Sequence, residues 1–124
     1  KSQQWELVDH EVAQCVAVMH AHKKCMKLIV ESGELTDEEL IRCCKTVTDN
    51  GVDFIKTSTG FSTTGATVHA VSIMRKHISP TTEIKASGGI RDFKFAQELI
   101  AAGATRIGCS ASIAIVAASA DKNV

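Results

Sequence analysis

Two lysines stand where a buried strand would normally carry apolar side chains. Lys56 lies in the run Asp53-Phe54-Ile55-Lys56-Thr57-Ser58-Thr59, and Lys85 lies in Glu83-Ile84-Lys85-Ala86-Ser87. A strand covered on both faces is usually almost continuously apolar. A single lysine there is equally consistent with a solvated edge strand. Two lysines on consecutive strands, each followed by a loop rich in Ser, Thr or Gly, favour a functional pair.

Paired lysines of this kind could form a Schiff base. Adjacent strands lie about 4.8 Å apart, so two ammonium groups that point the same way would repel each other. Such repulsion leaves one amine neutral near pH 7, and a neutral amine attacks carbonyl carbons. Lys27, in an earlier apolar run, is a weaker candidate that would add to the positive field.

Glycines after the later strands indicate a phosphate site. Gly88-Gly89 precedes a helix that Asp92 would cap, and Gly108-Cys109-Ser110 precedes the last helix. Free backbone N–H groups in such turns suit an anion. Arg91 would add a cation, although a solvated loop arginine explains it equally well.

The elements that would position these residues alternate between helix and strand. Apolar spacing predicts a leading helix with Trp5, Val8, Val12, Val16 and Met19 on one stripe, then four strand–helix units. The expected strands are 25–31, 52–58, 82–87 and 105–109. The expected helices open at Thr36, at about Val68, after Asp92 and after Ser112, and they end near Gly51, Ile78, Gly103 and Ala120. The helix that Thr36 opens would bury Leu40, Ile41, Cys44 and Val47. This alternation predicts an α/β fold with a parallel sheet, and the active site of such folds lies at the carboxyl ends of the strands.

Several segments together resemble the deoxyribose-phosphate aldolases. The matching segments are Lys27-Leu28-Ile29-Val30-Glu31, the stretches 54–62 and 65–67, Lys85-Ala86-Ser87-Gly88-Gly89-Ile90-Arg91, and 102–111. The resemblance implies a class I aldolase that reversibly cleaves 2-deoxy-D-ribose 5-phosphate to acetaldehyde and D-glyceraldehyde 3-phosphate. It further implies that Lys56 forms the Schiff base, that Lys85 perturbs its pKa, and that no cofactor or metal is needed. The substrate and phosphate would be bound by Thr59, Gly60, Gly88, Gly89 and Ser110.

The resemblance covers only part of the family's fold. It implies the C-terminal half of a (β/α)8 TIM barrel, with four parallel βα units preceded by one helix in a single partial domain over residues 1–124. The family's first four strands, and the aspartate that relays a proton in that family, would then have no counterpart here. Thr64 and Ala111 also depart from residues common in the family. Two alternatives are a non-catalytic half-barrel that retains phosphate or carbonyl binding, and a small flavodoxin-like phosphate-binding module.

Composition narrows the function classes. The chain has 124 residues, and its 14 basic and 14 acidic side chains give a formal net charge of zero, which argues against nucleic-acid or membrane partners. Its length is below the roughly 200 residues of a complete barrel. Five cysteines show no disulfide pattern, and His20, His22 and Cys25 lack the further ligands of a zinc site. We expect a cytoplasmic protein without a signal peptide, acting on a small phosphosugar and aldehyde, and forming a homo-oligomer because a half-barrel leaves strand edges open.

Overall fold

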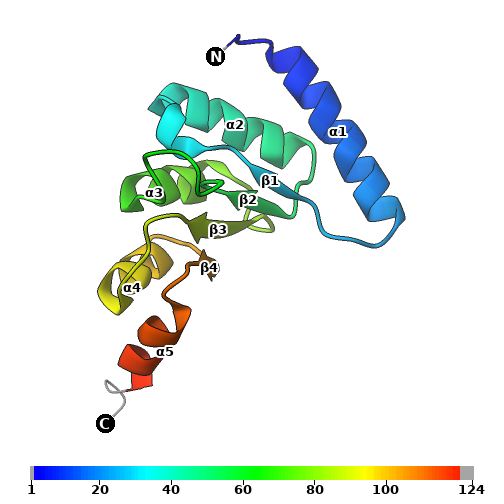
Figure 1. Ribbon diagram of the computed structural model, residues 1–124. Helices are drawn as coiled ribbons and strands as arrows, with labels where there is room; N and C mark the ends of the chain where they lie inside the picture. Colours follow the sequence, from blue (N-terminus) through cyan, green and yellow to red (C-terminus); the bar gives the residue numbers. More distant parts are fainter. Residues whose placement is uncertain (1, 121–124) are drawn as a thin grey trace.

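The computed structural model describes residues 2–120 and shows alternating helices and strands (Figure 1). A long helix, α1 (Trp5–Ala21), leads into the first strand, β1 (Lys27–Ile29), and a short 3-10 helix, η1 (Ser32–Glu34). The remaining elements are α2 (Asp37–Asp49), β2 (Phe54–Lys56), α3 (Val68–His77), β3 (Glu83–Ser87), α4 (Phe93–Ala101), β4 (Arg106–Gly108) and α5 (Ser112–Ala120). The predicted order of elements is confirmed, although β1, β2 and β4 are shorter than expected. The domain prediction also included residue 1 and residues 121–124, which lie outside the described part.

The four strands form one parallel sheet in the sequential order β1-β2-β3-β4. Parallel crossovers are right-handed, so a sequential order places successive helices on the same side of the sheet. Helices α2, α3 and α4 follow one another along that side (Figure 1). A doubly wound sheet would instead reverse its order partway. The observed order is that of consecutive units of a barrel wall, which confirms the predicted α/β half-barrel architecture.

Short-range signals set the helix ends as the sequence indicated. Thr36 and Glu39 form a complete capping box at the start of α2, and the Asp92 side chain accepts a hydrogen bond from the Phe95 N–H at the start of α4. Gly51 and Gly103, just beyond α2 and α4, adopt φ values of +66° and +118°, which favour glycine.

The core lies between the sheet and its helices. Ile55, Ile84 and Ala86 project from the strands and are fully buried, and Met74 and Leu99 meet them from α3 and α4. Alternation along each strand therefore turns the neighbouring residues, including both candidate lysines, to the opposite face.

Two residues predicted to be buried are exposed. Val8 is exposed although Val12 and Val16 on the same stripe are buried. Ile41 is exposed because it lies about 100° round the helix from Leu40, which faces the core.

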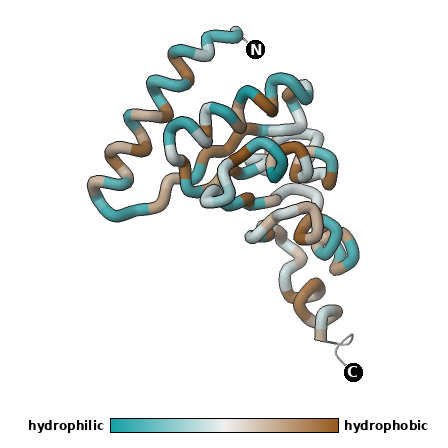
Figure 2. The backbone as a smooth tube through the Cα atoms, turned by 180° about the vertical axis from the view of Figure 1, so that it is seen from behind, coloured by the Kyte–Doolittle hydropathy of each residue, from teal (hydrophilic) through white to brown (hydrophobic). Residues whose placement is uncertain are grey.

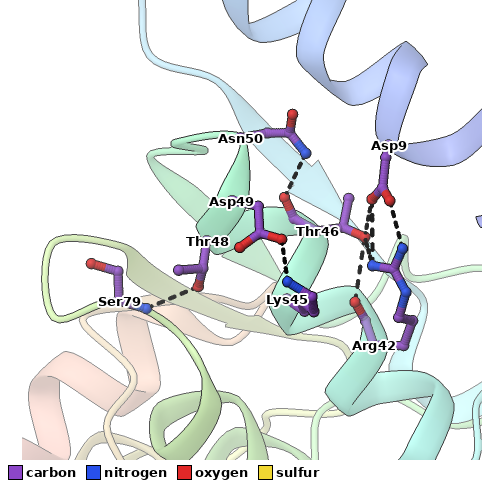
Figure 3. A network of polar contacts seen from close by, with 8 residues as sticks. All are labelled: Asp9, Arg42, Lys45, Thr46, Thr48, Asp49, Asn50 and Ser79. Carbon is purple, nitrogen blue, oxygen red and sulfur yellow. Dashed lines mark hydrogen bonds and ion pairs between the residues drawn. The ribbon is translucent and has the colours of Figure 1, made fainter. Parts of the chain in front are cut away.

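Polar contacts attach α1 to α2 (Figure 3). Asp9 accepts hydrogen bonds from the Arg42 guanidinium and from the Thr46 hydroxyl, the latter at 2.6 Å. These contacts, the Arg42 bonds above all, lower the pKa of Asp9 below its usual value of 3.8. The Arg42 guanidinium also lies over the Trp5 ring, with its carbon 5.2 Å from the ring centroid.

The last helix leaves hydrophobic side chains uncovered. Ile113 and Val116 on α5 are 88% and 66% exposed, and α5 extends away from the sheet (Figures 1 and 2). Within residues 2–120, the structure contains no helix that is both long and apolar enough to cross a membrane.

Candidate active site

A cavity of about 380 Å³ opens where β2, β3 and β4 end. It is lined by Lys56, Thr59, Gly60, Lys85, Ser87, Gly88, Gly89, Ile90, Arg91, Gly108, Cys109 and Ser110. All seven residues predicted for catalysis or for substrate and phosphate binding therefore line one cavity, at the carboxyl ends of the strands. Arg91, for which the alternative was a solvated loop residue, is exposed and lines the same cavity.

The two lysines are neighbours across the sheet. Lys56 of β2 pairs in register with Lys85 of β3, and Lys85 pairs in turn with Arg106 of β4. Three cationic side chains thus form a row on one face of the sheet. Both lysines are partly buried, and both line the cavity.

The pKa of Lys85 is lowered from its usual value of 10.5. Desolvation is the largest cause, followed by the positive charges of Lys27, Lys56 and Arg106. The expected contribution of Lys27 to the local field is thus present. The ammonium form of Lys85 is therefore disfavoured in this cavity.

The Phe54 ring on this face lies close to two cations, Lys27 and Arg106. The Lys27 ammonium lies 5.4 Å and the Arg106 guanidinium carbon 4.5 Å from the centroid of its ring. Cations near an aromatic face are attracted by its electron-rich surface, so the ring partly offsets their mutual repulsion.

Gly108 provides the space that Lys85 occupies. A Cβ atom at position 108 would lie 2.9 Å from Lys85 Cε, 3.5 Å from Lys85 Nζ and 3.1 Å from Ser87 Cβ. The Lys85 side chain therefore passes directly over the Gly108 backbone, and a larger residue there would displace it.

The glycine turn after β3 packs closely against Gly65, in the loop after β2. Gly88 and Gly89 adopt φ values of +91° and +75°, and a Cβ on Gly65 would come within 2.2 Å of the Gly88 carbonyl oxygen. That oxygen accepts a hydrogen bond from the Ala66 N–H at 3.0 Å. The loop after β2 and the turn after β3 consequently pack backbone against backbone. Thr64 belongs to the same loop and lies against Gly33, where a Cβ would be 2.6 Å from Thr64 Cβ.

A buried hydrogen-bond network ties the ends of β2 and β3 together. The Thr57 hydroxyl donates to the Ser87 carbonyl at 3.0 Å and accepts from the Ser87 N–H at 3.0 Å. The Ser87 hydroxyl donates to the Ser58 carbonyl at 2.9 Å, and the Ser58 hydroxyl donates to Thr57 Oγ1 at 3.1 Å. Because Thr57 follows Lys56 and Ser87 lies two residues beyond Lys85, this network fixes the relative position of the two lysines.

Comparison with known proteins decides the family. The sequence model described as DeoC/LacD family aldolase matches residues 1–117. The chain belongs to this aldolase family. It is 47% identical over 116 residues to the deoxyribose-phosphate aldolase of Lactococcus lactis subsp. cremoris strain SK11, covering 94% of this chain and 52% of that protein. It is 43% identical over 122 residues to the deoxyribose-phosphate aldolase of Thermococcus kodakarensis, covering 98% and 54%.

Solved aldolase structures show the same arrangement of elements. The structure titled "QR15, an Aldolase" superimposes with a TM-score of 0.87 at 35% identity, covering 99% of this chain and 55% of its own. The deoxyribose phosphate aldolase of Aeropyrum pernix, described as a unique tetrameric structure, gives a TM-score of 0.84 at 30% identity, covering 97% and 51%. This aldolase chain thus spans about half the length of the relatives that it matches.

Some lining residues of the aldolase cavity were not predicted as site residues. Ser87, Ile90 and Cys109 also line the cavity. They lie within the segments 85–91 and 108–110, which the sequence had already indicated, so a signal was present although only their neighbours were assigned a role. The weak metal candidates lie elsewhere, where His20 bonds Asp53 and His22 bonds the Val18 carbonyl. Among residues 2–120 no group of three or more metal-ligating side chains is gathered together.

Proposed function

We propose that this chain carries the Schiff-base half of a class I aldolase that cleaves 2-deoxy-D-ribose 5-phosphate to acetaldehyde and D-glyceraldehyde 3-phosphate. The observation that carries the proposal is the in-register pair Lys56 and Lys85 inside a cavity lined by glycine turns. The named relatives, which are deoxyribose-phosphate aldolases at 43–47% identity, support the choice of substrate.

Lys56 is the proposed nucleophile. Its neutral amine attacks C1 of the open-chain sugar, the new C–N bond forms, and the carbonyl oxygen leaves as water. The protonated imine then draws electrons from the C2–C3 bond, which breaks to give an enamine at C2. The C3 hydroxyl loses its proton as C3 becomes the aldehyde of glyceraldehyde 3-phosphate, and protonation and hydrolysis of the enamine release acetaldehyde.

Lys85 is the proposed electrostatic partner. Its pKa is lowered by desolvation and by the positive charges of Lys27, Lys56 and Arg106, so its ammonium form is disfavoured in the cavity. The family motif places the imine on Lys56, with Lys85 beside it on the neighbouring strand.

Backbone and hydroxyl donors are the proposed phosphate ligands. Gly88 and Gly89 follow the end of β3 with positive φ values, and Ser110 lies between β4 and α5 on the wall of the same cavity. Thr59 and Gly60 form the wall on the β2 side. Arg91, which is exposed at the rim, adds a cation.

We also propose that residues 1–124 form one partial-barrel domain and that the protein is a homo-oligomer. The outer edges of β1 and β4 have no strand partner among residues 2–120, and the Ile113 and Val116 side chains on α5 are exposed. Open edges and apolar patches promote association. A single species of monomer mass in light scattering, at high concentration, would contradict the oligomer.

Reductive trapping tests the imine. The protein is incubated with acetaldehyde and borohydride, digested, and mapped by mass spectrometry for an ethylated lysine. We expect the adduct on Lys56, its loss in Lys56→Arg, and normal melting of that variant, since arginine keeps the charge but is not a nucleophile. An adduct on Lys85 instead, or no adduct on the folded protein, would refute the assignment. Release of glyceraldehyde 3-phosphate from the sugar phosphate tests the complete reaction.

A further inference from the structure

Two carboxylates from the connection between β1 and α2 hold the loop that follows Lys56. Glu31 accepts hydrogen bonds from the Thr59 hydroxyl and from the Thr59 N–H, the latter at 3.2 and 3.3 Å to its two oxygens. Glu34 accepts a hydrogen bond from the Ser62 hydroxyl at 2.6 Å. The first contact is made at a residue that lines the cavity, and the second at a residue that does not.

The backbone around Glu31 is fixed on both sides. The Val30 N–H donates to the Lys56 carbonyl at 3.0 Å, and the Ser32 N–H donates to the Thr57 carbonyl at 2.8 Å. Glu31 itself has φ +51° and ψ +60°, a left-handed conformation that is unfavourable for a residue with a Cβ. This conformation turns the carboxylate away from the strand direction and toward the loop after β2.

The Thr59 hydroxyl makes two hydrogen bonds within the protein. Its hydroxyl donates to Glu31 and accepts from the Phe61 N–H at 3.2 Å, so the side chain has a defined orientation. Apolar packing does not hold the same loop at Phe61, because that side chain is 98% exposed. Hydrogen bonds therefore set the position of Thr59 and Gly60 at the cavity wall.

We propose that Glu31 is a positioning residue that fixes the Thr59–Gly60 wall for the phosphorylated sugar. The proposal rests on the proposed function and names a residue that touches Thr59, not the reacting atoms. A two-carbon aldehyde needs only to reach the Lys56 amine, whereas a five-carbon sugar phosphate is long enough to extend from that amine to the cavity walls. Loss of Glu31 should therefore weaken binding of the sugar phosphate and leave acetaldehyde almost unaffected.

Trapping with two carbonyl compounds tests this role. The half-saturating concentration for adduct formation on Lys56 is measured with 2-deoxyribose 5-phosphate and with acetaldehyde, for the unchanged protein, Glu31→Gln and the control Glu34→Gln. For Glu31→Gln we expect a rise of about tenfold with the sugar phosphate and less than twofold with acetaldehyde, because the amide loses the charge that strengthens its hydrogen bonds. Glu34→Gln should change neither value by more than about twofold.

Thr59 variants give a second measurement that does not depend on the folding of Glu31→Gln. Thr59→Val removes the hydroxyl that donates to Glu31 and should reproduce the selective tenfold loss with the sugar phosphate. The combined variant Glu31→Gln with Thr59→Val should lose no more than either alone, since both remove one contact.

The results separate the two proposals. If the unchanged protein forms no adduct on Lys56, the proposed function is refuted. If it forms the adduct with both compounds but Glu31→Gln and Thr59→Val bind the sugar phosphate normally, the role of Glu31 is refuted and the imine assignment stands. Equal losses with both carbonyl compounds would also refute the positioning role, because they would show a general effect on Lys56.

Discussion

Replacing Gly108 with alanine should damage the lysine pair without unfolding the protein. The added Cβ would lie 2.9 Å from Lys85 Cε and 3.1 Å from Ser87 Cβ. Non-bonded carbon atoms prefer separations of about 3.5–4.0 Å, so Lys85 Cε must move by roughly 0.6–1 Å. The long side chain of Lys85 can make that movement, whereas Ser87, which is held by its hydrogen bonds to Thr57, must give only a few tenths of an ångström.

A displacement of this size is enough to impair catalysis. Misplacing a catalytic group by about 1 Å can cost on the order of 100-fold in rate. We therefore expect the rate of acetaldehyde trapping on Lys56 to fall by about 10- to 100-fold in Gly108→Ala. The thermal unfolding midpoint should change only slightly, because the shift is absorbed by a side chain rather than by the core.

Gly51→Ala is the matched control. Gly51 has φ +66°, and an added Cβ would meet no other atom within 4 Å. It lies just beyond the end of α2 and does not line the cavity. This variant should lose roughly 1 kcal/mol of stability through backbone strain and trap acetaldehyde at the normal rate. If Gly108→Ala is folded and traps acetaldehyde as fast as the unchanged protein, the position of Lys85 does not control imine formation and the argument fails.

Three further predictions concern stability and reactivity. Thr57→Val should lower the free energy of unfolding by about 1–3 kcal/mol, since the buried Ser87 backbone groups lose their partner; urea unfolding that matches the unchanged protein would contradict this. The pKa of Asp9 is lowered by folding, so its stabilising contribution is present above its usual value of 3.8 and is lost as the pH falls through the lower folded-state value. In Asp9→Asn the free energy of unfolding should therefore depend less on pH in that range, and an unchanged pH dependence would exclude this contribution. Burial raises the pKa of Cys44 to about 12, so its thiol should resist alkylation at pH 8 while the exposed Cys15 reacts. Equal labelling rates in the folded protein would show that α2 opens.

Local rules were sufficient to predict the elements, because their signals lie within a few residues. Thr36 with Glu39, Asp92 and Gly103 each act on a neighbouring turn of backbone, and each behaves in the structure as its type indicates. Burial was harder to predict at Val8, which belongs to the apolar stripe of α1 but is exposed, whereas Val12 and Val16 on that stripe are buried. Such a case depends on which element packs nearby, and spacing along one helix does not contain that information.

The lysine pair was predictable because strand geometry repeats regularly. Two residues at equivalent places on adjacent parallel strands must face the same side, and the register of Lys56 with Lys85 confirms this reasoning. The support around the pair was not predictable. Thr57 bonds a residue 30 positions away, and Glu31 bonds one 28 positions away, so neither contact leaves a signal in a window of sequence.

For the proposed reaction, the site must meet two opposing electrostatic requirements. Desolvation and the neighbouring positive charges lower the pKa of Lys85, whereas a phosphate dianion close to its amine would raise that pKa again. Separation within the cavity reduces the conflict, because the Coulomb energy falls with distance. Gly88 lies three residues beyond Lys85, at most roughly 10 Å along the chain. Neutral backbone donors at Gly88 and Gly89 could then hold the phosphate without placing a further ammonium group there, which leaves the lysines free for the carbonyl.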